Sequence, residues 1–414
     1  MNNTTKQPTA ERLLDYELIL EAQDRIRKRV RHTELISSNH FSRQLGYPLL
    51  LKCENLQTTG AFKLRGAMNF MTAHERSELA QGVTAASAGN HAQGVAYAAD
   101  LLGIPAKIFM PETTPPQKVQ ATRDLGAEVV LTGANFDESF AAAQTDSLQS
   151  GTVFIHPFDD PLVMAGQGTI GLEILKDLPD VANIVVPIGG GGLLAGIAVA
   201  IKELNPRVRI IGVETASAPC MYRAVQDNYI TDVQLSVTIA DGIAVKKAGQ
   251  LTMPIIRDLV DELVLVEEEE IALAIVALLE KSKLLVEGAG AVALAALLNN
   301  KVAHVRGKTV CLLSGGNIDV RTLALVVERG LLAAGRYLKL RIEMQDTPGA
   351  LANLATDIAF TRANIHDITH DRRTKGLVMG TTAVQLVLET RGQDHAQQVL
   401  ALLAKRGYSV TTEQ

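Results

Sequence analysis

Residues 184–201 read IVVPIGGGGLLAGIAVAI, an apolar stretch that is cut by Pro187 and by four consecutive glycines. The β-branched run before the glycines is typical of a strand buried on both faces, and the run after them is typical of a helix. A membrane span would need an uninterrupted apolar helix. The stretch therefore predicts a buried strand, a glycine loop and a helix, and we expect no membrane association.

Short β-rich runs alternate with Ala/Leu-rich, helix-like stretches from about residue 48 to residue 330. The expected strands are residues 48–54, 83–87, 106–110, 127–131, 152–156, 183–188, 209–214, 262–267 and 308–314. Strands separated by helices form crossover units, which build a parallel sheet covered by helices on both faces. The sequence predicts a doubly wound, mainly parallel α/β body in two lobes, with a small lobe of about residues 53–160 inserted in the large one.

The pattern changes near Leu331. We expect a linker at residues 331–336, and residues 337–414 predict strand, helix, strand, strand, helix and strand in that order. A βαββαβ unit of this length is large enough to form a domain of its own. The expected organisation is a body of residues 1–330, the linker, and a small C-terminal domain.

The chain has 414 residues, and its 40 basic side chains against 45 acidic ones give a formal net charge of −5. This balance argues against a nucleic-acid partner, because such binders carry basic patches. The polar residues 1–12 lack the apolar core of a signal peptide. Cys53, Cys220 and Cys311 have no spacing typical of a disulfide framework or a zinc site. We therefore expect a cytoplasmic protein with free, buried thiols.

Two kinds of ligand fit the glycine loop of residues 189–192. Glycines between a strand and a helix let backbone amides approach an anion, and the helix N-terminus adds a partial positive charge, which favours a phosphate group. Gly190, Gly192 and Ala195 also match the G-x-G-x-x-[GA] outline of a dinucleotide site, with Glu214 at the end of the next expected strand. On this segment alone, a nicotinamide-dependent dehydrogenase stays an alternative.

Three further loops carry residues with chemistry. Lys63 follows a glycine turn in ENLQTTGAFKLRGA (residues 54–67), polar side chains gather in SAGNHAQG (residues 87–94), and CLLSGGNID (residues 311–319) places Ser314 at a strand end. Singly, each has an ordinary structural explanation, either a surface lysine whose stem covers apolar neighbours or the capping of a helix by serine or asparagine.

In combination these loops are specific. ENLQTTGAFKLRGA, SAGNHAQG, PIGGGGLLAG, EGAGA and LLSGGN follow one another in an order that resembles the signature of fold-type II pyridoxal-phosphate enzymes. The resemblance covers nearly the whole chain and is greatest to the threonine dehydratase (threonine ammonia-lyase) family. The C-terminal unit resembles a single ACT domain, because DTPGAL (residues 346–351) matches the D-x-P-G-x-L turn of that module.

The resemblance implies a pyridoxal 5′-phosphate cofactor in Schiff-base linkage to Lys63. It places Asn90 on the phenolic oxygen of the cofactor and Ser314 on the pyridine nitrogen, and it puts Glu287 near the cofactor without a defined role. The cofactor-binding residues that it implies are Phe62, Lys63, Asn90, Gly189, Gly190, Gly191, Gly192, Leu193 and Ser314. The residues expected to bind the substrate are Ser87, Ala88, Gly89, Asn90 and His91.

The residue types suit this chemistry. Lys63 lies between Phe62 and Leu64, a context compatible with the neutral amine that attack on a carbonyl and proton abstraction both require. The neutral hydroxyl of Ser314 holds a proton on the pyridine nitrogen less firmly than an aspartate would, which favours β-elimination over transamination. The family expectation is dehydration and deamination of L-threonine to 2-oxobutanoate and ammonia, with conversion of L-serine to pyruvate as a side activity.

Serine racemase and 3-hydroxyaspartate ammonia-lyase, which are similar in fold, are alternatives. A racemase needs a second acid/base, a serine in serine racemase, and this chain has Ala88 there. The divalent-metal site of serine racemase corresponds to Glu214, Ala218 and Cys220, where a thiol replaces an aspartate and puts magnesium or calcium in doubt. We therefore expect no metal and favour the dehydratase. A non-enzymatic amino-acid sensor is a distant alternative, since no cofactor residue is lost.

The family resemblance makes Lys63 and Ser314 the expected catalytic residues. The resemblance to ACT domains implies that an amino acid regulates the enzyme by feedback. The family expectation is isoleucine as the effector, in isoleucine biosynthesis. Valine, or no effector at all in a domain used only for assembly, stays open. The expected effector residues are Asp346, Gly349, Ala350, Leu351 and Asn364. We expect a homotetramer or a homodimer. His366 and His370 lie about 13 Å apart along an expected strand, too far for a shared metal.

Overall fold

The computed structural model describes residues 14–372 and 377–413, and the chain divides into two compact units, Met1–Asp319 and Val320–Gln414. The prediction that residues 1–12 are no signal peptide lies outside the described residues. Among the described residues, no helix is both long enough and apolar enough to cross a membrane.

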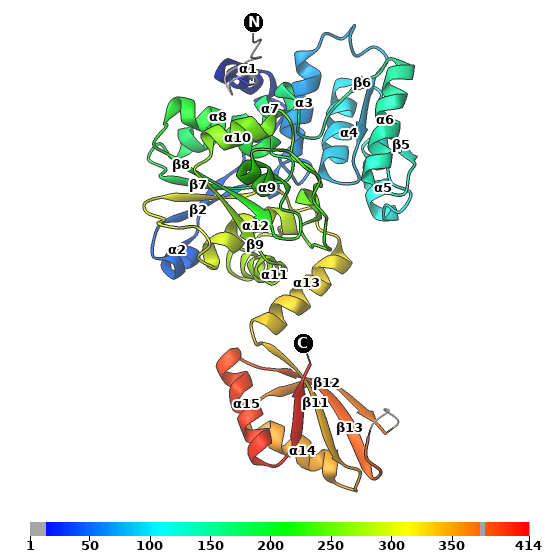
Figure 1. Cartoon of the computed structure of the whole chain (residues 1–414), viewed down its shortest axis with the longest axis vertical. Coiled ribbons are helices and arrows are strands. Elements are labelled where there is room, and N and C mark those ends of the chain that lie inside the picture. The colour runs from blue at the N-terminus through cyan, green and yellow to red at the C-terminus, as the bar shows by residue number, and fades with distance from the viewer. Residues whose placement is uncertain (1–13, 373–376, 414) are drawn as a thin grey trace, which may run out of the picture. The chain divides into compact units, whose positions relative to one another are not determined.

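The first unit contains a six-stranded sheet in the order β1-β2-β10-β7-β8-β9 (Figure 1). Its strands are β1 (Leu35–Ser37), β2 (Leu49–Cys53), β7 (Asn183–Pro187), β8 (Arg209–Thr215), β9 (Glu262–Val266) and β10 (Thr309–Leu313). All neighbours pair in parallel except β1, which pairs antiparallel with β2. Alternate residues of β7 such as Ile184 and Val186 join the core on one face, while α12 covers the other face.

The helices of this lobe lie on both faces of the sheet, as expected for a doubly wound fold. They are α1 (Tyr16–Ile26), α2 (Asn39–Leu45), α7 (Pro161–Asp177), α8 (Gly192–Leu204), α9 (Cys220–Asp227), α10 (Thr252–Leu259), α11 (Glu268–Ala277) and α12 (Gly288–Leu298). Glu267 caps the start of helix α11 and forms a capping box with Glu270, so the acidic run serves a helix start.

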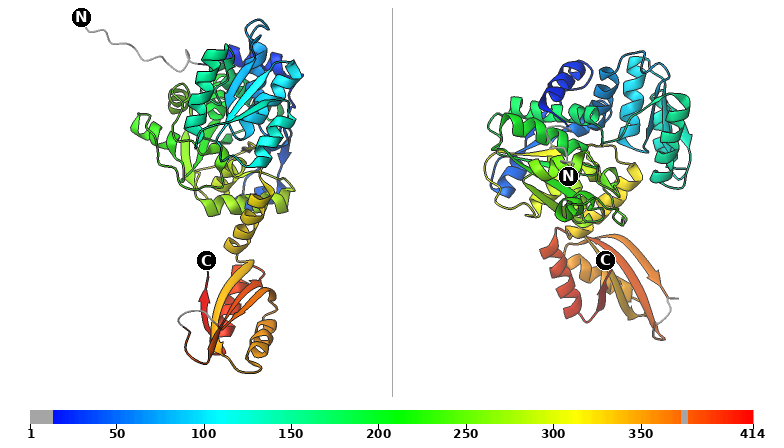
Figure 2. Two further views of the ribbon diagram at one scale, coloured as in Figure 1. Left: turned by 90° about the vertical axis from the view of Figure 1, so that its right-hand side faces the viewer. Right: turned by 45° about the horizontal axis from the view of Figure 1, so that its top comes forward.

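A second, four-stranded parallel sheet in the order β5-β4-β3-β6 forms the smaller lobe of the same unit, seen in cyan in Figure 2. Its strands are β3 (Val83–Ala86), β4 (Ala106–Met110), β5 (Glu128–Leu131) and β6 (Val153–Phe154). Its helices are α3 (Lys63–Ala73), α4 (Asn90–Leu102), α5 (Pro116–Asp124) and α6 (Phe136–Ser150). Ala85 and Ile108 pack with α3 and α4, whereas Ala86 and Phe109 pack with α6 on the opposite face. The predicted two-lobed α/β fold class is confirmed.

The second unit begins with α13 (Val320–Ala333), which continues into the first three residues of the expected linker. The remaining elements are β11 (Tyr337–Gln345), α14 (Ala350–Phe360), β12 (Asn364–Asp371), β13 (Thr381–Glu389), α15 (Gln393–Lys405) and β14 (Ser409–Thr412). The strands form an antiparallel sheet in the order β12-β13-β11-β14. This is the predicted βαββαβ succession, and its own core includes Leu340, Leu354 and Val384.

Candidate active site

The expected site residues follow the carboxyl ends of strands or begin the helices after them. Lys63 is the first residue of α3, Asn90 the first of α4 and Gly192 the first of α8, while Ser314 directly follows β10. Ligands of open parallel sheets bind at this edge of the strands.

Two loops pair with each other and thereby place Lys63 close to Ser314. The amide of Phe62 donates to the carbonyl of Ser314 at 3.1 Å, and the amide of Gly316 donates to the carbonyl of Gly60 at 2.9 Å. An isolated bridge between residues 61 and 315 lies between these two bonds. Ser314 is buried, with only 3% of the residue exposed.

The amine of Lys63 is held in a confined place. Its Nζ donates to the carbonyl oxygen of Pro157 at 2.7 Å and lies 5.2 Å from the centre of the Phe62 ring. Burial lowers the pKa of Lys63 to about 8, although the carboxylate of Glu287 acts in the opposite direction. Roughly a tenth of the amine is therefore neutral at pH 7, far more than for a free lysine, as a nucleophilic or basic lysine requires.

The glycine loop between β7 and α8 has the form of an anion cradle. Gly191 has φ +98°, which favours glycine, and Cβ atoms on Gly190 and Gly192 would lie 2.4 Å and 2.5 Å from atoms of Phe158. Among the residues that the structure describes, no protein acceptor takes the amides of Gly189, Gly190 or Gly191. Unused amides at the start of a buried helix suit the oxygens of a phosphate group.

The side chains of Asn90, Glu287 and Asn317 form a continuous hydrogen-bonded network. Asn90 Nδ2 donates to Glu287 Oε1 at 2.7 Å, and Asn317 Nδ2 donates to Asn90 Oδ1 at 2.9 Å. Burial, together with the charge of Asp241, raises the pKa of Glu287 to about 7, and the bond from Asn90 opposes this shift. This network fixes which way the Asn90 amide faces and leaves its second N–H for a ligand. The sequence suggested Glu287 but not Asn317.

The residues expected to bind the substrate surround the start of α4. Ser87 Oγ accepts from the amide of Gly89 at 3.1 Å, and a Cβ on Gly89 would meet no atom within 4 Å. His91 differs, because its ring is 3% exposed and its Nε2 lies 3.1 Å from the carbonyl of Ile155. Burial, followed by the charge of Lys63, lowers the pKa of His91 to about 3, so the ring is unprotonated near neutral pH and is a weak base.

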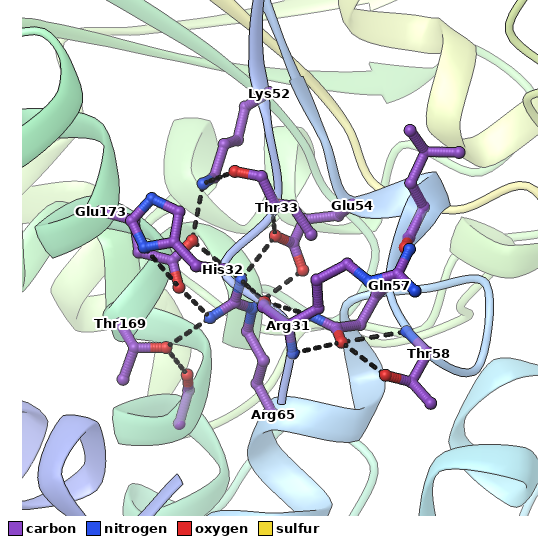
Figure 3. Close-up of polar contacts among 12 residues, drawn as sticks. Arg31, His32, Thr33, Lys52, Glu54, Gln57, Thr58, Arg65, Thr169 and Glu173 are labelled. Carbon is purple, nitrogen blue, oxygen red and sulfur yellow. Dashed lines mark hydrogen bonds and ion pairs between the residues drawn. The ribbon is translucent and has the colours of Figure 1, made fainter. Parts of the chain in front are cut away.

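A buried network of charges supports the helix that begins with Lys63 (Figure 3). Arg65 on α3 is fully buried and bonds both oxygens of Glu54 at 2.8–2.9 Å and both oxygens of Glu173 at 2.7–2.9 Å. Lys52 on β2 donates to Glu173 at 2.6 Å and to the carbonyl of Thr33 at 2.8 Å. Two cations balance two carboxylates, so this cluster ties α3 to β2 and α7 without an excess charge.

At the position that corresponds to the metal site of serine racemase, Glu214 is hydrogen-bonded to protein groups. Glu214 accepts from the amides of Met221 at 2.9 Å and Tyr222 at 2.7 Å, and Cys220 Sγ lies 3.5 Å from its Oε1. Burial raises the pKa of Glu214 to about 8, although the hydrogen bonds from these two amides act in the opposite direction. Within residues 14–372 and 377–413, no three His, Cys, Asp or Glu side chains are grouped to hold a metal ion.

The C-terminal unit carries a surface cavity of about 490 Å³ at the DTPGAL turn. Of the expected effector residues, Asp346, Gly349, Ala350 and Leu351 line it. Asn364 does not, because it starts β12 and donates to Glu389 at 3.1 Å. Arg372, which the sequence reading missed, lines the cavity and bonds Asp346 at 2.7 Å and 3.0 Å.

Residues 156–160 (HPFDD) were also not anticipated as part of the site. Pro157 receives the Lys63 amine, and Phe158 lies against the glycine loop. A proline followed by two aspartates before a helix predicts only a helix cap, and Asp160 does cap α7. The contact between Pro157 and Lys63 joins residues 94 positions apart, and no local spacing predicts such a contact.

The geometry combines a buried lysine amine with a glycine loop whose amides have no protein acceptor in the described part of the chain, and the neighbouring residues Pro157 and Phe158 contact one each. The chain matches the sequence profile of the family described as "Pyridoxal-phosphate dependent enzyme" over residues 26–315. The unused amides and the narrow glycine loop fit the phosphate of that cofactor, and Lys63 fits its aldehyde. The chain belongs to the pyridoxal-phosphate-dependent enzymes.

Relatives narrow this class. An L-threonine ammonia-lyase of Geobacter sulfurreducens is 68% identical over 398 residues, which are 96% of this chain and 99% of that protein. The processed form of threonine deaminase isoform 2 from Solanum lycopersicum is 38% identical, with a TM-score of 0.74 over 79% of this chain and 91% of that chain. Maize serine racemase is 36% identical, with a TM-score of 0.73 over 77% of this chain and 98% of that chain. Within the class, the chain belongs to the threonine ammonia-lyase family.

Proposed function

We propose that this protein deaminates L-threonine to 2-oxobutanoate and ammonia, and L-serine to pyruvate at a lower rate. The observation that carries the proposal is the Lys63 amine, whose pKa is lowered to about 8, in the same site as Asn90 and the glycine cradle. The name of the Geobacter sulfurreducens relative supports this choice of substrate.

Pyridoxal phosphate, when bound, supplies an electron sink for the bond broken at the substrate Cα. Lys63 holds the cofactor through its amine, and residues 189–193 receive the phosphate at the start of α8. Once the substrate replaces it, the free amine of Lys63 takes the Cα proton, because burial keeps part of it neutral. Pro157 then keeps the released amine in place, since its carbonyl oxygen accepts one N–H at 2.7 Å.

Ser314 and Ala88 favour elimination over the alternatives. Ser314 would offer a neutral hydroxyl where an aspartate would hold a positive charge on the cofactor. The negative charge formed when the Cα proton is removed would then be less stabilised, which would favour loss of the β-hydroxyl, together with a proton, as water. Ala88 has no proton to give to the opposite face of the Cα, as a racemase requires. The amides at the start of α4, with Ser87 and the open space at Gly89, receive the substrate carboxylate.

The test is spectroscopic and chemical. Purified protein should carry the visible absorbance band of lysine-bound pyridoxal phosphate and release 2-oxobutanoate and ammonia from L-threonine. Lys63→Ala should lose both, whereas Lys107→Ala, which removes a lysine paired with Asp146 in the same lobe, should keep both. A band with interconversion of L- and D-serine but no oxo acid would indicate a racemase. A protein without a band after incubation with pyridoxal phosphate would contradict the proposal.

We also propose that the C-terminal cavity binds an apolar amino acid, isoleucine first. Arg372 and Asp346 pair with each other at the surface, and this pair could separate to receive the carboxylate and the ammonium of a zwitterion. Pro348 and Leu351 supply apolar contact beside them. Only an effector that binds two states of the enzyme with different affinity would regulate it.

Two coarser expectations complete the proposal. We infer a homo-oligomer, a dimer or a tetramer, to be measured as molar mass in solution. We place the protein in the cytoplasm, which the free and buried Cys53, Cys220 and Cys311 support, because such thiols need no oxidising compartment.

A further inference from the structure

Residues 156–160 contact the Lys63 amine and the glycine loop from one short turn. The segment joins β6 to α7 and has the sequence His-Pro-Phe-Asp-Asp. Three residues of this turn carry those contacts: Pro157 binds the Lys63 amine, Phe158 packs on the glycine loop, and Asp159 supports the loop through Thr252.

His156 shapes this turn through one ring nitrogen. Its Nδ1 accepts from the amide of Phe158 at 3.2 Å and from the amide of Asp159 at 2.8 Å. A nitrogen that accepts two N–H bonds carries no proton, so this network assigns the neutral ring with its hydrogen on Nε2. Burial, followed by the charge of Lys63, lowers the pKa of His156 to about 4, which keeps the ring neutral at physiological pH.

The surroundings of the ring contain few other charges. Lys63 on α3 and the neutral His91 on α4 are its titratable neighbours, while Phe140 on α6 and Phe154 on β6 pack edge-on against it. The ring is therefore held by aromatic packing and serves the turn as a fixed acceptor.

The turn presents the carbonyl oxygen of Pro157 to Lys63 Nζ at 2.7 Å. A carbonyl is only an acceptor, so it binds one N–H of the amine whether the amine is neutral or charged. In the neutral amine this fixes one hydrogen and thereby restricts where the lone pair can face. The direction of the lysine amine depends on the turn that His156 holds.

The next two residues reach the anion cradle. The ring of Phe158 lies where a Cβ on Gly190 would be, with three ring atoms 2.4 Å from that position. The carboxylate of Asp159 accepts from the amides of residues 250, 251 and 252 at 2.9–3.2 Å. Thr252 in turn donates its hydroxyl to the carbonyl of Gly190 at 2.6 Å. The same turn thus supports the glycine loop from two sides.

We propose that His156 is a positioning residue that couples the orientation of the Lys63 amine to the shape of the phosphate cradle. The inference rests on the proposed function, because it assumes that Lys63 and the cradle hold the same cofactor. His156 itself makes no contact with substrate and transfers no proton.

The experiment tests separately the two features of His156, its hydrogen-bond acceptor and its aromatic ring, by replacing one at a time. His156→Asn keeps a side-chain oxygen that accepts amides two and three residues on, as asparagine does in turns. His156→Phe keeps an aromatic ring and loses the acceptor. Each holoenzyme is titrated from acid to alkaline pH while its visible band is recorded, and the apparent dissociation constant for pyridoxal phosphate is measured after dialysis.

His156→Phe should move the midpoint of the band and weaken cofactor binding by at least about tenfold, while His156→Asn should stay within about threefold of wild type. Asp160→Ala is the matched control. Asp160 caps α7 in the same segment, and it contacts neither Lys63 nor the glycine loop. It should lower the unfolding temperature but leave the band midpoint and the affinity unchanged.

A His156→Phe enzyme with wild-type midpoint and affinity would overturn the inference, and so would equal losses in the two variants. If His156→Phe does not fold, His156→Asn decides alone, since a changed midpoint or affinity there contradicts the acceptor role. Absence of any band in the wild-type protein would instead sink the proposed function. The two failures are thus distinguishable.

Discussion

At Lys63 two neighbours act on the amine in opposite directions. Burial lowers its pKa to about 8, and the carboxylate of Glu287 raises it. Glu287 itself has a pKa raised to about 7 by burial, so it is mostly charged at the midpoint of the Lys63 titration. The two groups titrate in adjacent pH ranges, and the charge of one sets the range of the other.

Glu287→Gln is therefore expected to lower the pKa of Lys63 further. The variant keeps a side-chain oxygen for Asn90 but removes the negative charge that stabilises the ammonium form. The pH at which apoprotein begins to combine rapidly with pyridoxal phosphate should move to lower values. Stopped-flow measurement of this rate against pH checks the shift, and Glu269→Gln, at an exposed position in the first turn of α11, serves as the control. An unchanged or raised midpoint would refute the assigned charge effect.

Individual residues could be predicted where their chemistry is local. Lys63, Asn90 and Ser314 each lie in a glycine-bearing loop motif, and the contacts of those loops bring them together in the structure. His156 and Asn317 were not predicted as site residues. Asn317 bonds Asn90, 227 residues away, and the turn that His156 holds reaches Lys63 through the carbonyl of Pro157, 94 residues away. Their roles depend on tertiary structure alone.

At the scale of elements, the turn from β7 into α8 depends on the absence of side chains. Gly190→Ala would place a methyl group 2.4 Å from three atoms of the Phe158 ring, so either the ring or the loop must move. Overpacking of this kind costs about 1–3 kcal/mol, and we expect cofactor affinity to fall about tenfold or more.

The matched control for that substitution is Gly46→Ala at the end of α2. Gly46 has φ +80° and no atom within 4 Å of an added Cβ, so alanine there meets strain but no neighbour. It should cost about 1 kcal/mol of stability and leave cofactor binding unchanged. Equal losses of cofactor in both variants, measured by equilibrium dialysis, would show that the loop has no special role.

The buried charges around Arg65 lead to a third prediction. Glu173→Gln would leave Arg65 and Lys52 with one carboxylate between them in a site closed to water. Breaking a buried pair on one side costs about 3–5 kcal/mol, so the urea midpoint of the apoprotein should fall markedly. Arg65→Lys should not be tolerated either, because lysine cannot replace the fork that binds both carboxylates.

The exposed pair of Glu21 and Arg25 on α1 gives the comparison. Glu21→Gln removes one charge of an i,i+4 pair in water, where such pairs contribute little. Chemical denaturation should not distinguish it from wild type. A Glu173→Gln protein as stable as Glu21→Gln would mean that the buried network does not secure α3.

Element prediction succeeded where apolar runs were long and failed where pairing was short. Every expected strand of the α/β body is present, from β2 to β10. The three-residue β1 was missed, since a strand this short has no periodicity and exists through its pairing with β2. The linker expected from residue 331 lacks a breaker before Gly335, and α13 accordingly extends to Ala333.

At the scale of the whole molecule, the two compact units have separate cores and separate chemistry. The first carries the lysine and the glycine loop, and the second carries the cavity with Asp346 and Arg372. A ligand of the second unit changes the enzyme only if it favours one of two states of the chain. Binding and regulation are therefore distinct questions, and binding is tested first.

Isoleucine is expected to raise the unfolding temperature of the holoenzyme, because a ligand that binds the native state stabilises it by mass action. Arg372 pairs with Asp346, holds the pKa of that carboxyl below its usual value, and is the cation available to a ligand carboxylate in this cavity. Arg372→Ala should abolish the isoleucine shift, while Asn364→Ala, outside the cavity, should retain it.

Calorimetric scans with isoleucine, valine and alanine distinguish an apolar side-chain site from a general amino-acid site. A shift that survives Arg372→Ala would move the effector site away from the DTPGAL turn, and no shift with any of the three would leave the second unit as an assembly domain.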